Sequence, residues 1–327
     1  MSERIAGNSG GKGGTSGGKG GKGGTRGGTR GGTGGGKSEM AGGRVGGKTE
    51  DSLKEKARGF IEETIKKPIA HCVRSREKEN DWTIIHAIVN GIVKHDFPEE
   101  VDLRIGNDWW EIGNQGYTGS CTAWAATDSL LRWHLVRAKK INETERLSVQ
   151  FTWMAAKETD NFTTYPETFI ENSGTPLKGA LNVLKKYGAV LDKHLPFGGR
   201  IIDPQMDAET FYSIASLFSI NSYYSIIKEY DVNLDHLRMW LASIGPIIAM
   251  TDTDWNFRNY NNGGKLDSYD LTTVVPDTGH AIAIVGYTKN HFIIRNSWGT
   301  DWGDNGYAYA SNDYVAAAFC EGYGIWV

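Results

Sequence analysis

The spacing of apolar residues changes part-way along the chain, and this change predicts a helical half followed by a β-rich half. The stretch 122–140 contains neither Gly nor Pro, and its apolar residues recur at helical spacing. The side chains expected on the buried face of this helix are Trp124, Leu131, Leu135 and Ala138. Ser120 is a favoured N-cap residue, so we expect the helix to begin at Cys121.

Further segments have the periodicity or the boundary residues of helices. The first ends before Pro68, because the residue that precedes a proline avoids helical backbone. Ser148 is a plausible N-cap for another, and Gly188 is a stop signal. The predicted helical segments are 53–65, 82–93, a helix that begins after Ser148, 176–187 and 234–242.

From about Phe211 onward, short β-rich runs alternate with turns. The predicted strands are 244–250, 281–287 and 291–295, and the predicted hairpin turns are 288–290 and 302–306. The pair Asn305-Gly306 suits a turn of the primed type. Residues 97–104 are expected to be extended, because Pro98 biases its predecessor towards extended backbone.

Residues 1–49 are mostly Gly, with Lys, Arg, Thr and Ser between them. Such a segment cannot bury enough apolar surface to offset the entropy of ordering it, so we expect a flexible tether. The alternative is an arm that contacts nucleic acid or another polyanion, since its Thr-Arg-Gly-Gly repeats resemble arginine–glycine segments. The tether is favoured, because the arm has no aromatic side chain that could stack on bases.

The composition of the 327 residues narrows the function classes. A formal net charge of −3 gives no bulk electrostatic reason for nucleic-acid binding. Cys72, Cys121 and Cys320 form neither a disulfide framework nor a zinc-binding pair, so we expect no metal and no cofactor. They favour a cytoplasmic or otherwise reducing location, and association with a virion is compatible with them. We also expect no signal peptide and no membrane span, and the oligomeric state stays open.

Cys121 is the first candidate for chemistry. Gly113, Gly116 and Gly119 make the approach to it a loop, because glycine tolerates tight turns. The positive end of the predicted helix would stabilise a thiolate there, and the thiolate is the nucleophilic form of cysteine. The alternative is a buried, inert cysteine that only packs.

His280 and Asn296 are predicted to lie at the same end of the hairpin. A turn centred near Lys289 places residue 280 opposite about residue 298, so the two side chains become diagonal neighbours on one face. Asn296 can then orient the imidazole, which could act as a general base or as the cation of an ion pair with a thiolate. The alternative for this pair alone is a surface His beside a turn Asn.

The candidate residues lie in three ordered blocks: Gln115-Gly-Tyr-Thr-Gly-Ser-Cys121, Gly279-His-Ala-Ile-Ala-Ile-Val-Gly-Tyr287 and Arg295-Asn-Ser-Trp-Gly-Thr-Asp-Trp-Gly-Asp-Asn-Gly-Tyr307. In order and spacing these blocks resemble the signature blocks of the papain-like cysteine peptidases, the cathepsin family. The stretch 97–104 also resembles the start of the family's mature domain. The resemblance covers about residues 97–327.

This resemblance implies a catalytic role for three residues. Cys121 would be the nucleophile. His280 would hold it as a thiolate and later protonate the leaving amine. Asn296 would orient His280. Together they would make this chain a cysteine peptidase that acts on polypeptides, most simply as an endopeptidase.

Four further residues receive roles from the same resemblance. Gln115 would donate its side-chain amide to the oxyanion, with the backbone N–H of Cys121 as the second donor. Trp298 would shield the hydrogen bond between His280 and Asn296 from water. Gly174 and Gly279 would border the substrate backbone.

The resemblance also implies an α+β, papain-like fold with two lobes and the site in the cleft between them. A helical lobe would span about 107–215, and an antiparallel, β-barrel-like lobe about 216–327. Residues 1–49 would precede this peptidase domain as a disordered Gly/Lys/Arg-rich arm, and residues 50–96 as a helical pro-like or accessory segment.

The sequence departs from the family's pattern beside Cys121 and in the region before the mature domain. Thr122 stands where the family usually has Trp, and Thr118 replaces a Cys. The common disulfides are therefore absent, which fits the disulfide-poor bacterial, archaeal and viral branch. The usual long helical pro-segment is also missing. If residues 50–96 block the cleft instead, removal of residues 1–96 should raise activity, and unchanged activity would refute this.

Two alternatives to an endopeptidase remain open. An exopeptidase or an amide-forming transferase would use the same thiol chemistry. A catalytically silent, papain-like binding or structural protein, displayed by the basic arm, is the alternative from another class. The complete set of Gln115, Cys121, His280 and Asn296 argues against the silent protein. The cleavage specificity stays open.

Overall fold

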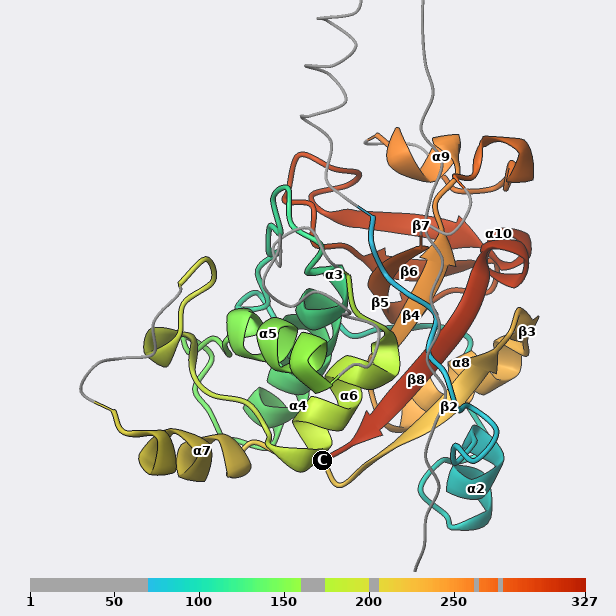
Figure 1. The fold of residues 1–327 in the computed structure, drawn as a ribbon. Coiled ribbons are helices and arrows are strands. Elements are labelled where there is room, and N and C mark those ends of the chain that lie inside the picture. The colour runs from blue at the N-terminus through green and yellow to red at the C-terminus, as the bar shows by residue number, and fades with distance from the viewer. Residues whose placement is uncertain (1–69, 160–173, 200–205, 262–264, 276–278) are drawn as a thin grey trace, which may run out of the picture. The chain divides into compact units, whose positions relative to one another are not determined.

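The computed structural model describes residues 70–159, 174–199, 206–261, 265–275 and 279–327. The predicted N-terminal arm and the helix predicted before Pro68 lie outside the described residues. Within the described part, one group of helices packs beside a large sheet (Figure 1). This arrangement confirms the predicted α+β class.

The helix predicted from Cys121 is present, but it is built from three successive pieces. They are α3 (Cys121–Ala123), the π-helix η1 (Trp124–Leu131) and α4 (Arg132–Arg137). Every residue of η1 is buried. Ala138 was expected on the buried face but is exposed, because α4 ends at Arg137 and Ala138 is the C-cap residue that follows it.

Three more helices belong to this side of the fold: α5 (Val149–Thr159), α6 (Leu177–Lys186) and α7 (Ala208–Ser216). Ser148 caps α5 as predicted, because its hydroxyl accepts the N–H of Phe151 at 3.0 Å. Gly188 follows α6 with φ +83°, the left-handed conformation that ends a helix.

The expectation of β structure from Phe211 onward is wrong for α7. Asp207 caps this helix by accepting the N–H of Thr210 at 2.8 Å, and Phe211 and Ala215 are buried one turn apart. Both signals are present in the sequence, an Asp before a pair of apolar residues at i and i+4. The β-rich pattern begins only at residue 222.

All strand pairs are antiparallel, in the order β3-β2-β8-β4-β5-β6-β7, and β1 pairs with β5. In the described residues the β lobe is thus an open sheet rather than a closed barrel. The strands are β1 (Val101–Asp102), β2 (Ser222–Lys228), β3 (Asp231–Val232), β4 (Ile247–Asp252), β5 (Gly279–Tyr287), β6 (His291–Arg295), β7 (Tyr307–Ser311) and β8 (Phe319–Trp326).

The hairpin of β5 and β6 has the predicted register at the end that carries His280. Ala283 lies opposite Arg295, and continuing this register sets position 280 opposite position 298. At the next turn, Asn305 and Gly306 have φ values of 52° and 88°. A primed turn needs left-handed backbone at both positions, so this prediction is also confirmed.

The sheet is buried on both faces. Along β5, Ala281, Ala283 and Val285 join the core on the side of α3, η1 and α6. The alternate residues Ile282 and Ile284 join a second core with α2 (Ile84–Val89) and α8 (Leu234–Ser243), which confirm two predicted helices. The remaining helices of the described residues are α9 (Trp255–Arg258), α10 (Asn312–Ala318) and the short 3-10 helices η3 (Asp192–His194) and η4 (Leu271–Thr273).

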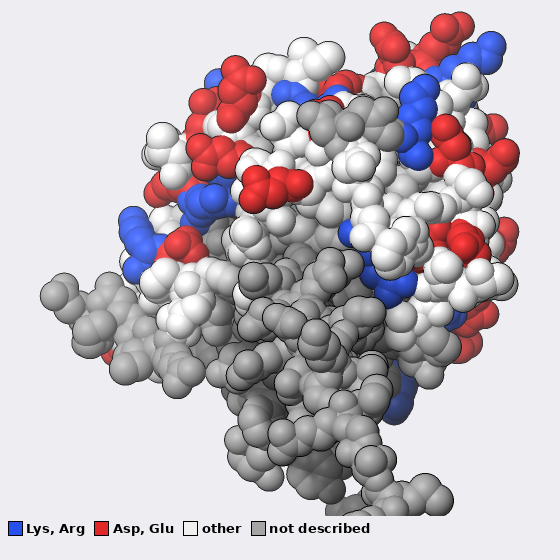
Figure 2. All heavy atoms as spheres, turned by 90° about the horizontal axis from the view of Figure 1, so that it is seen from above, with Lys and Arg blue, Asp and Glu red and all other residues white. Residues whose placement is uncertain are grey.

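Acidic and basic side chains are interspersed on the face of the molecule drawn in Figure 2. Among the described helices, none is long and apolar enough to cross a lipid bilayer.

Candidate active site

Cys121 and His280 are brought together because α3 packs against β5. Cys121 is the first residue of α3, and His280 is the second residue of β5. Both residues have 0% of their surface exposed. The backbone N–H of Ala281, which follows His280, donates to the Cys121 sulfur. The thiol at a helix start and the imidazole at a strand end therefore lie at one place.

The His280 ring is held by the Asn296 side chain. His280 Nε2 lies 2.7 Å from Asn296 Oδ1, which also accepts the backbone N–H of Ser297 at 2.8 Å. Because Oδ1 can only accept, the imidazole hydrogen is on Nε2. Within the described residues, His280 Nδ1 is buried and has no hydrogen-bond partner. Its lone pair is thus the group that can take a proton from a thiol.

Aromatic rings enclose this histidine. The ring centroid of Trp298 lies 4.5 Å from that of His280, and Phe257 lies 5.9 Å away. Burial lowers the pKa of His280 to about 4, and the hydrogen bond to Asn296 opposes this only in part. In the enclosed site the imidazole is neutral at pH 7.

Gln115 is placed by the loop that follows β6. Its backbone N–H donates to the carbonyl oxygen of Ser297 at 2.8 Å, and the hydroxyl of Ser297 donates to Gln115 Oε1 at 2.7 Å. The side-chain amide of Gln115 donates to the carbonyl oxygen of Thr118 at 2.8 Å. Gln115 is completely buried, so the position of its amide is fixed by these bonds.

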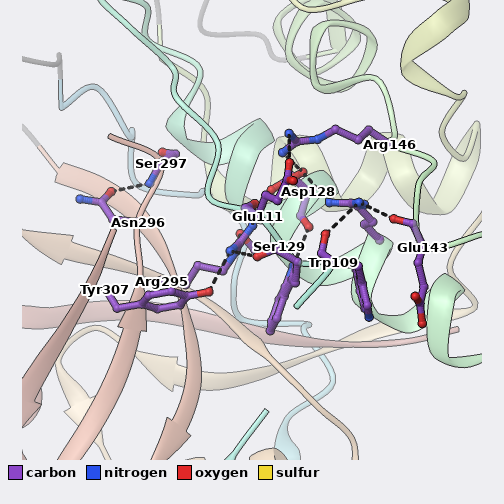
Figure 3. Close-up of polar contacts among 12 residues, drawn as sticks. Trp109, Glu111, Asp128, Ser129, Glu143, Arg146, Arg295, Asn296, Ser297 and Tyr307 are labelled. Atoms are coloured by element: carbon purple, nitrogen blue, oxygen red, sulfur yellow. Dashed lines mark hydrogen bonds and ion pairs between the residues drawn. The ribbon is translucent and has the colours of Figure 1, made fainter. Parts of the chain in front are cut away.

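A buried ionic cluster fixes the backbone just before Asn296 (Figure 3). Arg295 Nη2 lies 2.8 Å from Asp128 Oδ2, and Asp128 belongs to η1. The Arg295 guanidinium also donates to the carbonyl oxygens of Trp110 at 2.9 Å and Glu111 at 2.6 Å. The end of β6 is thereby tied to the helix that carries Cys121.

Residues 70–78, here called the cleft segment, run along the line where the helices meet the sheet (Figure 1). The N–H of Cys72 donates to the carbonyl oxygen of Gly279 at 2.7 Å. The N–H of Val73 donates to the carbonyl oxygen of Thr175 at 3.4 Å. The segment thus bonds to β5 on one side and to the loop before α6 on the other, as an extended ligand would.

The cleft segment also covers the thiol. A Cβ built on Gly174 would lie 1.3 Å from the carbonyl oxygen of His71, so only glycine permits this approach. Burial raises the pKa of Cys121, although the backbone N–H groups of Ala281 and His71 act in the opposite direction. The covered thiol is therefore held in its neutral form.

All seven residues singled out from the sequence border this one place, on α3, β5, the loop after β6 and the loops before α3 and α6. Sequence reasoning missed Ser297 and Glu321 on β8, and it gave only the wider region 50–96 for the segment that could block the cleft. The N–H of Ser75 donates to Glu321 Oε2 at 3.0 Å across 246 positions of sequence, and no local pattern predicts such a contact. In the described residues, no group of three or more His, Cys, Asp or Glu is placed to hold a metal ion.

A sequence model of the papain family of cysteine proteases matches residues 97–321. Cathepsin J of Mus musculus is 29% identical over 226 residues, which cover 63% of this chain and 60% of that protein. Procathepsin L of Felis catus is 27% identical over 253 residues, which cover 72% of this chain and 66% of that protein. The chain thus spans less than two thirds of the length of either relative.

Solved structures show the same fold. Xylellain, a cysteine protease from Xylella fastidiosa, superposes with a TM-score of 0.63 at 22% identity, over 80% of this chain and 97% of that chain. Digestive procathepsin L 3 of the Tenebrio molitor larval midgut superposes with a TM-score of 0.55 at 18% identity, over 85% and 86%.

Proposed function

The chain belongs to the papain family of cysteine proteases, and from this premise we propose that it hydrolyses peptide bonds with Cys121 as the nucleophile. The observation that carries the proposal is the state of His280. Its Nε2 is fixed by Asn296 at 2.7 Å, and its Nδ1 is buried without a partner among the described residues, beside the helix that begins with Cys121.

The proposed reaction uses the residues in the following order. His280 Nδ1 takes the thiol proton, and Cys121 Sγ attacks the carbonyl carbon of the scissile bond. The oxyanion is stabilised by the Cys121 N–H and by the side-chain amide of Gln115, which releases Thr118. His280 then protonates the leaving amine, and water hydrolyses the thioester to regenerate the thiol. Trp298 keeps water from the bond between His280 and Asn296.

The cleft segment is the inhibitory part of this proposal. It occupies the two backbone positions, at Gly279 and beside Gly174, at which an extended substrate would bind, and it buries Cys121. The chain is therefore latent until the segment leaves. In this proposal the cleft segment is the part of the region 50–96 that blocks the site, and removal of residues 1–96 is still expected to raise activity.

The test uses the full chain in a loosened form, Cys72→Pro with Ser75→Pro. Proline has no N–H, so these changes delete the bonds to Gly279 and Glu321 without altering either acceptor. An epoxide that alkylates thiols is added, and the adduct is located by peptide mass spectrometry. We expect much faster modification of Cys121 in the loosened variant than in the unaltered chain, and loss of this rate in His280→Ala.

Cys320 is the internal control, because it is also buried and free but bonds to the carbonyl oxygen of Met250 at 3.6 Å, away from the imidazole. Modification of Cys121 no faster than Cys320 in the loosened variant would overturn the peptidase proposal. Equal rates in the loosened and unaltered chains would overturn the inhibitory role alone.

The proposal has three further parts: the mode of cleavage, the location and a polyanion contact. Internal cleavage of polypeptides, rather than exopeptidase action or amide transfer, follows from the extended path of the cleft segment through the site. A reducing location is supported by three cysteines that are all free. A polyanion contact through residues 1–49 concerns a segment outside the described residues.

A further inference from the structure

Two of the three free cysteines lie together where the cleft segment covers the site. Cys72 belongs to the segment and Cys121 begins α3, and both side chains are buried. The N–H of His71, directly before Cys72, donates to the Cys121 sulfur. Burial raises the pKa of Cys72, and repulsion from Cys121 raises it further, so the two sulfurs are close enough to interact. The proposed nucleophile therefore has a second thiol beside it.

The Thr122 side chain lies between these two thiols. Its hydroxyl lies 3.4 Å from Cys72 Sγ and donates to the carbonyl oxygen of Thr175 at 2.8 Å. The same side chain hydrogen-bonds to the sulfur of Cys121. One oxygen atom thus contacts both sulfurs, and a side chain as large as tryptophan at this position would meet the Cys72 sulfur.

The bonds of the cleft segment bring Cys72 back to the same place after each opening. Its N–H donates to the carbonyl oxygen of Gly279 at 2.7 Å, and the N–H of Ser75 donates to Glu321 Oε2 at 3.0 Å. Ser75 Oγ also accepts the backbone N–H of Lys178 at 3.1 Å. Because the segment is part of the same chain, it rebinds at a high effective concentration. Its thiol therefore reaches the nucleophile ahead of a dilute external thiol.

We propose that Cys72 and Cys121 form a reversible disulfide when the chain meets hydrogen peroxide, and that this bond locks the cleft segment in place and protects the nucleophile from further oxidation. The regulatory role rests on the proposed peptidase function, whereas the bond itself is measured without turnover. Such a pair suits the reducing location proposed for the chain, because disulfides in reducing compartments are usually transient and redox-sensing.

The reaction begins when the segment lifts and exposes Cys121 to the peroxide. His280 Nδ1 takes the thiol proton, and the thiolate attacks one peroxide oxygen. The O–O bond breaks, the sulfur becomes a sulfenic acid, and the released hydroxide leaves as water with the proton from His280. When the segment returns, the Cys72 sulfur attacks the Cys121 sulfur, and the hydroxyl leaves with the Cys72 proton as a second water. The two thiols lose two electrons and two protons, and one peroxide becomes two waters.

The experiment treats the unaltered full-length chain with hydrogen peroxide at neutral pH. The digest is analysed by mass spectrometry without reduction. We expect a pair of peptides joined through Cys72 and Cys121, and an intact mass lower by two hydrogen atoms. A dithiol should reverse the bond by thiol–disulfide exchange, so alkylation of the denatured chain should then find all three thiols again.

Cys72→Ser tests the protective role, because serine keeps the backbone N–H and a similar size but supplies no thiol. After the same treatment, Cys121 of this variant should carry sulfinic or sulfonic acid, which a dithiol does not reverse. Cys320→Ser is the matched control. Cys320 Sγ bonds to the carbonyl oxygen of Met250 at 3.6 Å, and it repels Cys72 less than Cys121 does. The control should keep the linked pair.

The outcomes separate this proposal from the peptidase. A pair linked through Cys320, a link between two chains, or no link at all overturns the disulfide. Equal irreversible oxidation of Cys121 in the unaltered chain and in Cys72→Ser overturns its protective role. Rapid epoxide labelling of the loosened variant without any link leaves the peptidase intact. A link between Cys72 and Cys121 without such labelling supports the disulfide and overturns the peptidase.

Discussion

The Asp128 carboxylate neutralises the buried cluster behind the site, and Asp128→Asn tests how much stability it supplies. Its Oδ2 lies 2.8 Å from Arg295 Nη2, and its Oδ1 lies 2.8 Å from Arg146 Nη2 and 3.8 Å from Arg132 Nη1. The side chains of Arg295 and Arg132 are 1% and 3% exposed. Asparagine keeps the size of the side chain but removes its charge.

We expect Asp128→Asn to lower the free energy of unfolding by about 3–5 kcal/mol at pH 7, because it leaves two buried guanidinium groups without a counter-ion. The pair with Arg146 adds little to this figure, since the Arg146 side chain is 33% exposed and water screens it. The amide of asparagine still accepts hydrogen bonds, so the lower end of the range is favoured.

The loss of unfolding free energy in Asp128→Asn should become smaller as the pH falls. Burial by itself raises the pKa of Asp128, but attraction by Arg295, Arg146 and Arg132 outweighs it and lowers the pKa below its ordinary value. A carboxyl with a lowered folded pKa adds stability above its unfolded pKa of about 4, and this is lost as pH falls through the folded pKa. The difference between the two proteins should therefore be full at pH 7 and shrink below about pH 4.

Urea unfolding measures this difference, in a Cys121→Ala background that removes the proposed nucleophile. Asp235→Asn is the control: Asp235 lies 2.8 Å from Arg238 Nη1, but its side chain is 60% exposed. Its loss should be below about 1 kcal/mol. A loss at Asp128 no larger than this control, or one that is the same at pH 3 and pH 7, would refute the reasoning.

Three shorter predictions follow from the site and the sheet. Between its unfolded pKa of about 6.5 and its folded pKa of about 4, His280 binds more protons when unfolded, so acid destabilises the fold in this range. The unfolding free energy of His280→Gln should therefore vary less from pH 7 to pH 4, and an equal slope would contradict this. Gln115→Ala in the loosened variant should lower kcat about a hundredfold or more, measured on a peptide substrate, and a smaller loss would exclude it as an oxyanion donor. Gly324→Ala should cost about 1–3 kcal/mol in urea unfolding, since its Cβ would lie 1.9 Å from the Trp240 ring, and a neutral result would show that the ring can move.

Local patterns in the sequence were enough to place the catalytic candidates. The helix start at Cys121 and the hairpin that joins His280 to Asn296 depend on turn residues and on periodicity within about 20 positions. The error at Phe211 has the same origin, because a short apolar run fits either a strand or a helix until its cap is considered. The π-helix η1 has no such signal, and the end of α4 at Arg137 leaves Ala138 exposed as the C-cap residue.

What the sequence by itself determined is therefore which residues occupy each local element and which face of that element is apolar. The tertiary structure decided what covers each face. It brought Ser75 and Lys78 to Glu321, set Asp128 against Arg295, and placed the cleft segment over Cys121. A spacing of 2 or 3.6 residues between apolar side chains predicts which positions are buried, but it does not identify the residues that pack against them. A buried charge is tolerated only when a remote group compensates it, so such residues become predictable only once the chain has folded.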